Sequence, residues 1–185
     1  VPQIFSTTAN GSRTFNFNVD LTQDPSNYTS ASVVNLFYWC NWMHDQLYSL
    51  GFTASAGNFQ GNDPVYALAQ RGAGNTATTT NRNNSSFATL ADGTTPNGGL
   101  MQMFVSNTTS PARDAAFDTH VILHEYTHGL SNRLVGQFTD ATKVPIYQPQ
   151  TLGMGEGWSD FYSLALTASP QADPNAVYPW AAYFF

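Results

Sequence analysis

Hydrophobic positions in the first third of the chain predict one amphipathic helix. Between Ala31 and Leu50, apolar residues recur at intervals of three and four, which places their side chains on one helical face. Ser30 precedes this stretch as a candidate N-cap, and Gly51 follows it as a candidate stop. The positions that form the expected face are Val33, Val34, Phe37, Cys40, Met43, Leu47 and Leu50.

On either side of this helix the pattern favours extended chain. Phe15, Phe17 and Val19 alternate with polar residues, which predicts a half-buried strand. Residues 51–99 are rich in Gly, Asn, Thr and Ser, and short apolar stretches such as Val65–Ala69 predict strands between long loops. Leu100–Val105 has the character of a further strand. The N-terminal part is therefore expected to contain a sheet.

The second half of the chain predicts two more helices. Apolar positions between Asp114 and Gly136 cover a surface wide enough for a central, buried helix. A second helix is expected from Glu156 to about Thr167, ahead of three prolines that disfavour further helix. A sheet followed by two helices of this kind indicates an α+β fold.

Composition limits the classes of protein to consider. With 185 residues, of which 42% are hydrophobic, the chain can bury a core of ordinary size, and residues 1–185 are expected to form a single domain. A formal charge of −6 with only six Lys and Arg disfavours nucleic acid and anionic membrane surfaces as partners. No apolar stretch approaches the length of a membrane span. The lone Cys40 is expected to pack as a small buried residue.

The central helix carries a pair of histidines with metal-ligand spacing. His124 and His128 are four residues apart, so on a helix they lie on one face and can converge on one cation. Glu125 then lies beside the metal, where a carboxylate can take a proton from a water that zinc has made more acidic. We interpret the histidines as zinc ligands and Glu125 as the general base of a metallopeptidase.

A third ligand is expected from the following helix. Catalytic zinc sites typically have three protein ligands and one open position, and Glu156 is the best candidate. Asp160 follows four residues later, so one carboxylate can face zinc while the other fixes a ligand imidazole. His120 extends the histidine row, but three such side chains span about 12 Å and cannot share one tetrahedral ion. We expect His120 to be a structural or rim residue.

These motifs resemble known zinc peptidases. H-E-x-x-H with a later E-x-x-x-D is similar to thermolysin-type enzymes, and a narrower set of stretches resembles the fungalysin family of secreted endopeptidases. The resemblance implies a thermolysin-like fold with an N-terminal mixed sheet, a central zinc-binding helix and a following ligand-bearing helix. The stretches that carry it are Asn35–Trp39, Met43–Asp45, Ala56–Gln60, Met101–Met103, His124–Leu134 and Gly153–Asp160.

The resemblance also implies roles for individual residues. It assigns one Zn²⁺ to His124, His128 and Glu156, catalysis to Glu125 and outer support to Asp160, and it leaves calcium undecided. Gly155 stands where thermolysin has asparagine, so the outer partner of His128 stays open. Asn132 is expected either to orient His128 or to face solvent.

Substrate contacts follow from the same resemblance. The strand Leu100–Val105 looks like the edge along which a peptide adds as an extra strand, which makes Gln102 and Met103 candidate substrate-binding residues. An ordinary core strand is the alternative. Tyr147 precedes Glu156 by nine residues, a spacing similar to that of a thermolysin tyrosine that helps to hold the developing oxyanion.

The resemblance further implies that residues 1–185 are an incomplete catalytic domain. Thermolysin-like enzymes place an intermediate-stabilising histidine well beyond the third ligand, whereas no histidine follows His128 here. A largely helical C-terminal half is therefore expected to be missing. Val1–Gln3 lacks signal-peptide character, so a leader and the pro-segment of a zymogen are expected to have been removed or omitted.

The expected function is that of a secreted, extracellular zinc endopeptidase acting on protein or peptide substrates. Its pro-segment and its missing C-terminal half are the other expected partners, and the sequence does not decide the oligomeric state. The alternative is a zinc-stabilised fragment or interaction module without activity on its own. Glycosylation sequons fit a secreted glycoprotein and begin at Asn10, Asn27, Asn83, Asn84 and Asn107.

Overall fold

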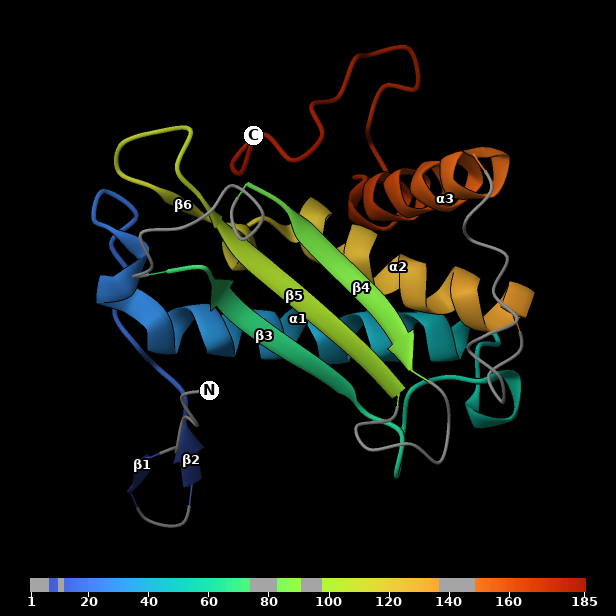
Figure 1. Ribbon diagram of the computed structural model, residues 1–185, viewed down its shortest axis with the longest axis horizontal. Helices are drawn as coiled ribbons and strands as arrows, with labels where there is room; N and C mark the ends of the chain where they lie inside the picture. Colours follow the sequence, from blue (N-terminus) through green and yellow to red (C-terminus); the bar gives the residue numbers. More distant parts are fainter. Residues whose placement is uncertain (1–6, 10–11, 74–82, 91–97, 137–148) are drawn as a thin grey trace.

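The computed structural model describes residues 7–9, 12–73, 83–90, 98–136 and 149–185. Its centre is a mixed sheet with two long helices on one face and a third helix packed against the second (Figure 1). This arrangement confirms the α+β fold. The strands are β1 Thr7–Ala9, β2 Ser12–Thr14, β3 Val65–Arg71, β4 Ser85–Leu90, β5 Gly98–Ser106 and β6 Arg113–Asp114, and the helices are α1 Thr29–Ser49, α2 Thr119–Gly136 and α3 Pro149–Thr167.

Strand β5 is the middle of the sheet. It pairs with β3 in parallel on one side and with β4 antiparallel on the other, and its end pairs with β6. Met101 and Met103 are 0% exposed. The expectation that this strand is an edge is therefore wrong, and the alternative of a core strand is confirmed. Within the described residues, β4 is the strand at the outer edge on the side of α2.

Helix α1 forms as expected, with differences at its start and along its face. It begins at Thr29 without a side-chain cap, so the expected cap by Ser30 is wrong. Gly51 ends the helix with a left-handed φ of 101°, and the amide of Phe52 donates to the carbonyl of Leu47. Phe37 is 65% exposed, because the face that turns to the core is formed by Ser32, Leu36, Met43 and Leu47.

The strand expected around Phe15 to Val19 does not form. These residues belong to no helix or strand, and Phe15 and Val19 are 44% and 47% exposed. An alternating pattern of apolar and polar residues does not provide a neighbouring strand. Without one, the backbone N–H and C=O groups must form hydrogen bonds with water. Just before this segment, β1 and β2 form a short antiparallel hairpin.

Helix α3 begins at Pro149, seven residues before its expected start at Glu156. Proline suits the first turn of a helix, where its missing N–H is not needed. The helix then continues through three glycines, although each costs about 1 kcal/mol in a helix interior. We attribute its persistence to packing against α2, because Gly155, Ser159 and Ser163 are buried.

A buried arginine fixes the far end of α2. The Arg133 side chain is 1% exposed and forms two bonds to the Asp63 carboxylate, with N–O distances of 2.5 and 2.9 Å. It also donates to the carbonyl of Gly57 and lies 4.3 Å from the ring centroid of Phe59. The loop before β3 is thereby held against α2 by a paired, desolvated charge.

Residues 168–185 return to the start of α2. The Asp118 carboxylate caps α2 by accepting from the amide of His120, and it also accepts from the amides of Tyr183 and Phe184. Arg113 donates to the carbonyl of Tyr183. In the part of the chain that the structure describes, no helix has the length and apolar character needed to cross a membrane.

Gly129 allows β4 to pack closely on α2. We therefore expect alanine at this position to destabilise the fold, although alanine usually stabilises a helix relative to glycine. A Cβ at Gly129 would lie 2.6 Å from the ring of Phe87 and 2.8 Å from that of Phe59. We expect Gly129→Ala to lower the free energy of unfolding by about 1–3 kcal/mol despite the better helix propensity of alanine. Thermal or denaturant unfolding of the full-length protein measures this.

Gly153→Ala is the matched control. Gly153 lies in α3, and a Cβ added there would have no neighbouring atom within 4 Å, so we expect the substitution to be neutral or to stabilise by up to about 1 kcal/mol. Equal effects of the two substitutions would contradict the role of Gly129 in strand packing.

Candidate metal centre

Helices α2 and α3 bring together the two motifs that the sequence singled out. Nε2 of His124 lies 3.1 Å from Nε2 of His128 and 3.0 Å from Oε2 of Glu156, and the remaining pair is 3.5 Å apart. A tetrahedral ion with bonds of about 2.0–2.1 Å has ligand atoms about 3.3 Å apart. The three donor atoms therefore have the spacing that a zinc-sized ion requires.

The protonation pattern favours a cation at the same point. Nδ1 of His124 lies 2.8 Å from Oδ1 of Asp160, so the ring donates there and its Nε2 carries the lone pair. That lone pair faces a carboxylate oxygen of Glu156 and the second imidazole. Three acceptors directed at one point repel one another unless a proton or a metal ion lies between them. Burial, and then the neighbouring His124, lower the pKa of His128, which favours the neutral form that binds metals.

Glu125 is buried beside this cluster. It is 4% exposed, and its Oε1 accepts a hydrogen bond from the hydroxyl of Ser85 on β4. Burial is the main cause that raises the pKa of Glu125 to about 8, the Ser85 bond opposes it, and the charge of Glu156 adds to it. A carboxyl group whose pKa lies near neutral pH can both accept and return a proton.

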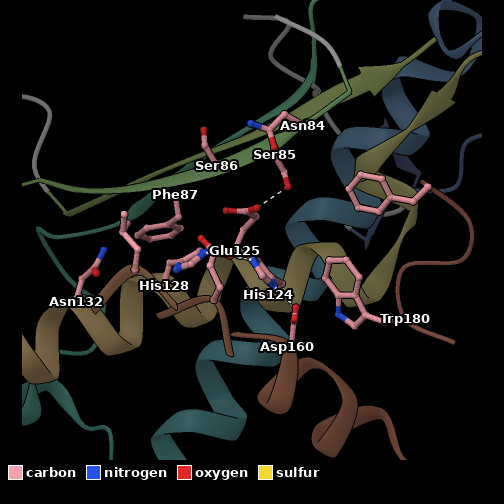
Figure 2. Close-up of a pocket in the computed structure, with 13 residues that line it drawn as sticks. Asn84, Ser85, Ser86, Phe87, His124, Glu125, His128, Asn132, Asp160 and Trp180 are labelled. Carbon is pink, nitrogen blue, oxygen red and sulfur yellow. Dashed lines mark hydrogen bonds and ion pairs between the residues drawn. The ribbon is translucent and has the colours of Figure 1, made fainter. Parts of the chain in front are cut away.

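The cluster opens into a cavity of about 580 Å³ between β4 and α3 (Figure 2). Glu125 and both histidines lie at its floor, and Asn84 together with Ser85 to Phe87 of β4 forms one wall. Apolar side chains of Leu152, Trp180 and Phe185 also line it. The ring of Trp180 lies 5.3 Å from that of His124, and its Nε1 donates to Ser163. The cavity therefore has a polar floor, and both polar and apolar side chains surround it.

The structure separates the remaining candidate residues from this cluster. Gln102 and Met103 lie on the core strand β5 and do not line the cavity; Gln102 donates to Ser86, and Met103 is fully buried. This location does not support their predicted contact with substrate, which rested on β5 being an edge. Tyr147 lies outside the described residues.

Two further side chains near the histidines have structural contacts. Nε2 of His120 contacts the hydroxyl of Thr167, and its Nδ1 accepts from the amide of Ala181, so it ties the C-terminal segment to α2. Asn132 donates to Thr89 and is 7% exposed, so neither expectation for it is met. Gly155 has no side chain to offer His128; a Cβ there would lie 3.9 Å from its Nδ1.

Sequence reasoning missed several residues that line the site, Ser85, Trp180 and Phe185 among them. Ser85 is forty positions before Glu125 in a stretch rich in Asn and Ser, and only strand packing brings the two together. Trp180 and Phe185 follow the last helix, where no periodic pattern marks them. An aromatic-rich ending after prolines is the one signal that points to a packed segment.

Comparison with known proteins agrees with this geometry. The family described as Fungalysin metallopeptidase (M36) matches residues 2–185. Extracellular metalloproteinase 10 of Coccidioides posadasii is 43% identical over 168 residues, which cover 86% of this chain and 25% of that protein. Extracellular metalloproteinase 5 of Trichophyton tonsurans is 42% identical over 163 residues, covering 83% and 25%.

A third relative gives the same result. Extracellular metalloproteinase mep of Aspergillus fumigatus is 44% identical over 155 residues, which cover 79% of this chain and 23% of that protein. The chain thus spans about a quarter of the length of these relatives. A family match over nearly every residue, together with relatives above 40% identity, shows that the chain belongs to the fungalysin metallopeptidases.

Proposed function

We propose that this chain forms the zinc-binding part of a secreted endopeptidase, with His124, His128 and Glu156 as ligands and Glu125 as the general base. The observation that carries the proposal is the convergence of three ligand atoms, 3.0–3.5 Å apart, beside a buried carboxylate. Asp160 would hold His124 in the tautomer that binds metal.

The residues divide the chemistry between them. When bound, zinc would make a water molecule more acidic and polarise the scissile carbonyl. Glu125 would accept a proton from the attacking water and return it to the departing amine, which is acid–base work for one carboxylate. The lowered pKa of His128 favours its neutral, metal-binding form, and the carboxylates of Glu156 and Asp160 would supply negative charge to hold a divalent cation.

Substrate would lie along β4. This strand forms one wall of the cavity and has an open edge in the described part of the sheet. An extended peptide that adds to such an edge gains main-chain hydrogen bonds, and its side chains alternate between the two faces. Phe87, Leu152 and Trp180 would then favour apolar side chains near the scissile bond.

The setting of the enzyme follows from its relatives. Their names describe extracellular metalloproteinases, and we extend secretion and the use of protein or peptide substrates to this protein. Because the chain spans about a quarter of their length, we propose that residues 1–185 are one part of the catalytic unit, which acts with a pro-segment and a C-terminal half.

The role of Glu125 predicts a separation of metal binding from hydrolysis. In full-length protein, Glu125→Gln keeps about one zinc per chain and lowers kcat by at least about 100-fold, because the proton acceptor is lost. His128→Ala loses the zinc. Metal analysis and a peptide-cleavage assay on the same preparations measure both effects.

His120→Gln is the control for the metal measurement, because His120 lies one turn from His124 and outside the cluster. It keeps one zinc per chain. Hydrolysis by the Glu125→Gln variant at the wild-type rate would contradict the mechanism. Zinc binding by wild-type protein without any hydrolysis would favour the alternative of a zinc-stabilised interaction module.

Asp160 predicts a graded effect on metal affinity. Asp160→Asn removes the charge that Nδ1 of His124 faces, so zinc affinity falls by about 10- to 100-fold. Competition with a chelator measures it. Asp45→Asn is the matched control, since Asp45 contacts Nδ1 of His44 at 2.9 Å on α1, away from the cluster. An equal loss in both variants would argue against a specific contribution of Asp160.

Addition of substrate to β4 predicts a period-two response to backbone methylation. In a series of identical peptides, each N-methylated at one position, kcat/KM should fall at alternate residues, whose amides face the strand. Steady-state cleavage assays measure the series. A uniform response, or sensitivity at the scissile bond alone, would rule out binding as an added strand.

A further inference from the structure

The general base has a partner on the edge strand, and this contact points to a role for Ser85. The hydroxyl of Ser85 donates to Oε1 of Glu125, and both residues line the cavity (Figure 2). Oε2 of Glu125 is buried and has no hydrogen-bond partner among the described residues. We propose that Ser85 is a positioning residue that sets the orientation of the Glu125 carboxylate, an inference that rests on the proposed function.

The packing of β4 on α2 determines which residues of the strand and the helix meet. Alternate residues of a strand face the same side, and Ser85, Phe87 and Thr89 all face α2. Their partners on α2 are Glu125, Gly129 and Asn132, which follow one another at about one helical turn. The packing of Phe87 against Gly129 therefore sets the position along α2 at which Ser85 meets Glu125.

A free glutamate side chain could not hold this orientation. It has three side-chain torsions, and an active site requires its groups to be placed within about 0.5 Å. The Ser85 bond fixes one carboxylate oxygen, Oε1, and thereby sets the direction of the other. Asp160 does the same for His124 from α3. Each chemical group is thus oriented by a side chain from a different element.

One strand would then perform two tasks. The open edge of β4 would bind the peptide, while the inward face of β4 orients the base through Ser85. The same strand would then determine both the register of the bound peptide and the direction of the Glu125 carboxylate. Misplacement of the base would therefore lower turnover without weakening the binding of substrate or metal.

Kinetics on the full-length zinc enzyme test this. Ser85→Ala should lower kcat by about 10- to 100-fold, which corresponds to loss of one charge-assisted hydrogen bond, with KM and zinc content unchanged. Ser85→Thr keeps the hydroxyl and should restore most of kcat. Thr89→Val is the matched control, because it loses a strand-to-helix hydrogen bond that does not involve Glu125, and it should keep the wild-type kcat.

A second readout does not depend on activity. In metal-free protein, Ser85→Ala should lower Tm in the wild-type background and have a smaller effect when Glu125 is already Leu, because the contact is then absent. Equal shifts in the two backgrounds would overturn the contact. An unchanged kcat in Ser85→Ala, or a joint loss of kcat and zinc, would overturn the positioning role.

The outcomes separate this inference from the proposed function. If Glu125→Gln is inactive and Ser85→Ala is fully active, the enzyme mechanism stands and the role of Ser85 falls. If wild-type protein with zinc does not cleave peptides, the proposed function falls and the positioning role falls with it, while the metal-free measurement still decides whether the Ser85 contact exists.

Discussion

The close approach of α3 to α2 is the constraint on which the site depends. Both helices carry a pair of candidate site residues at a spacing of four, His124 with His128 on α2 and Glu156 with Asp160 on α3. Pairs of this kind face each other only if the helix surfaces come close. Gly155, Ser159 and Ser163 supply the small, buried stripe that allows it, at the same spacing. Glycines weaken α3 as an isolated helix, but one of them, Gly155, allows α3 to approach α2 closely.

Close packing also creates an electrostatic problem that a metal would solve. Two imidazoles and the exposed carboxylate of Glu156 lie within hydrogen-bond distance of one another, and Glu125 is buried beside them. Burying such groups without compensation costs several kcal/mol, and the raised pKa of Glu125 and the lowered pKa of His128 both reflect that cost. A divalent cation converts the same arrangement from repulsive to attractive.

The sequence predicts what depends on local spacing. The positions of His124, His128, Glu156 and Asp160 on two helices follow from steps of four residues, and a helix turns those steps into a common face whatever its neighbours. Strand order does not follow from local spacing. An apolar stretch such as Leu100–Val105 looks the same in the middle of a sheet as near its edge. The pattern therefore could not correct the resemblance, which made this stretch the edge strand, whereas β4 is the edge strand that lines the cavity.

Exposure and long-range contacts are beyond local patterns for the same reason. Phe37 fits a helical repeat and Phe15 a strand repeat, yet both are exposed, since burial depends on which elements pack against each face. Ser85 meets Glu125 only because β4 aligns with α2 through Phe87 at Gly129, a contact between residues about forty positions apart.

The contacts that build the site all involve helix α2. It is mostly buried, it is anchored at one end by Asp118 and near the other by Arg133, and it carries both histidines and Glu125. Strand β4 contacts it from one side and α3 from the other, so Glu125 and His124 are each held by a side chain from a different element. A substitution in β4 or α3 would then displace one side chain of the site and not all of them. The precision of the site thus depends more on the rigidity of α2 than on either wall alone.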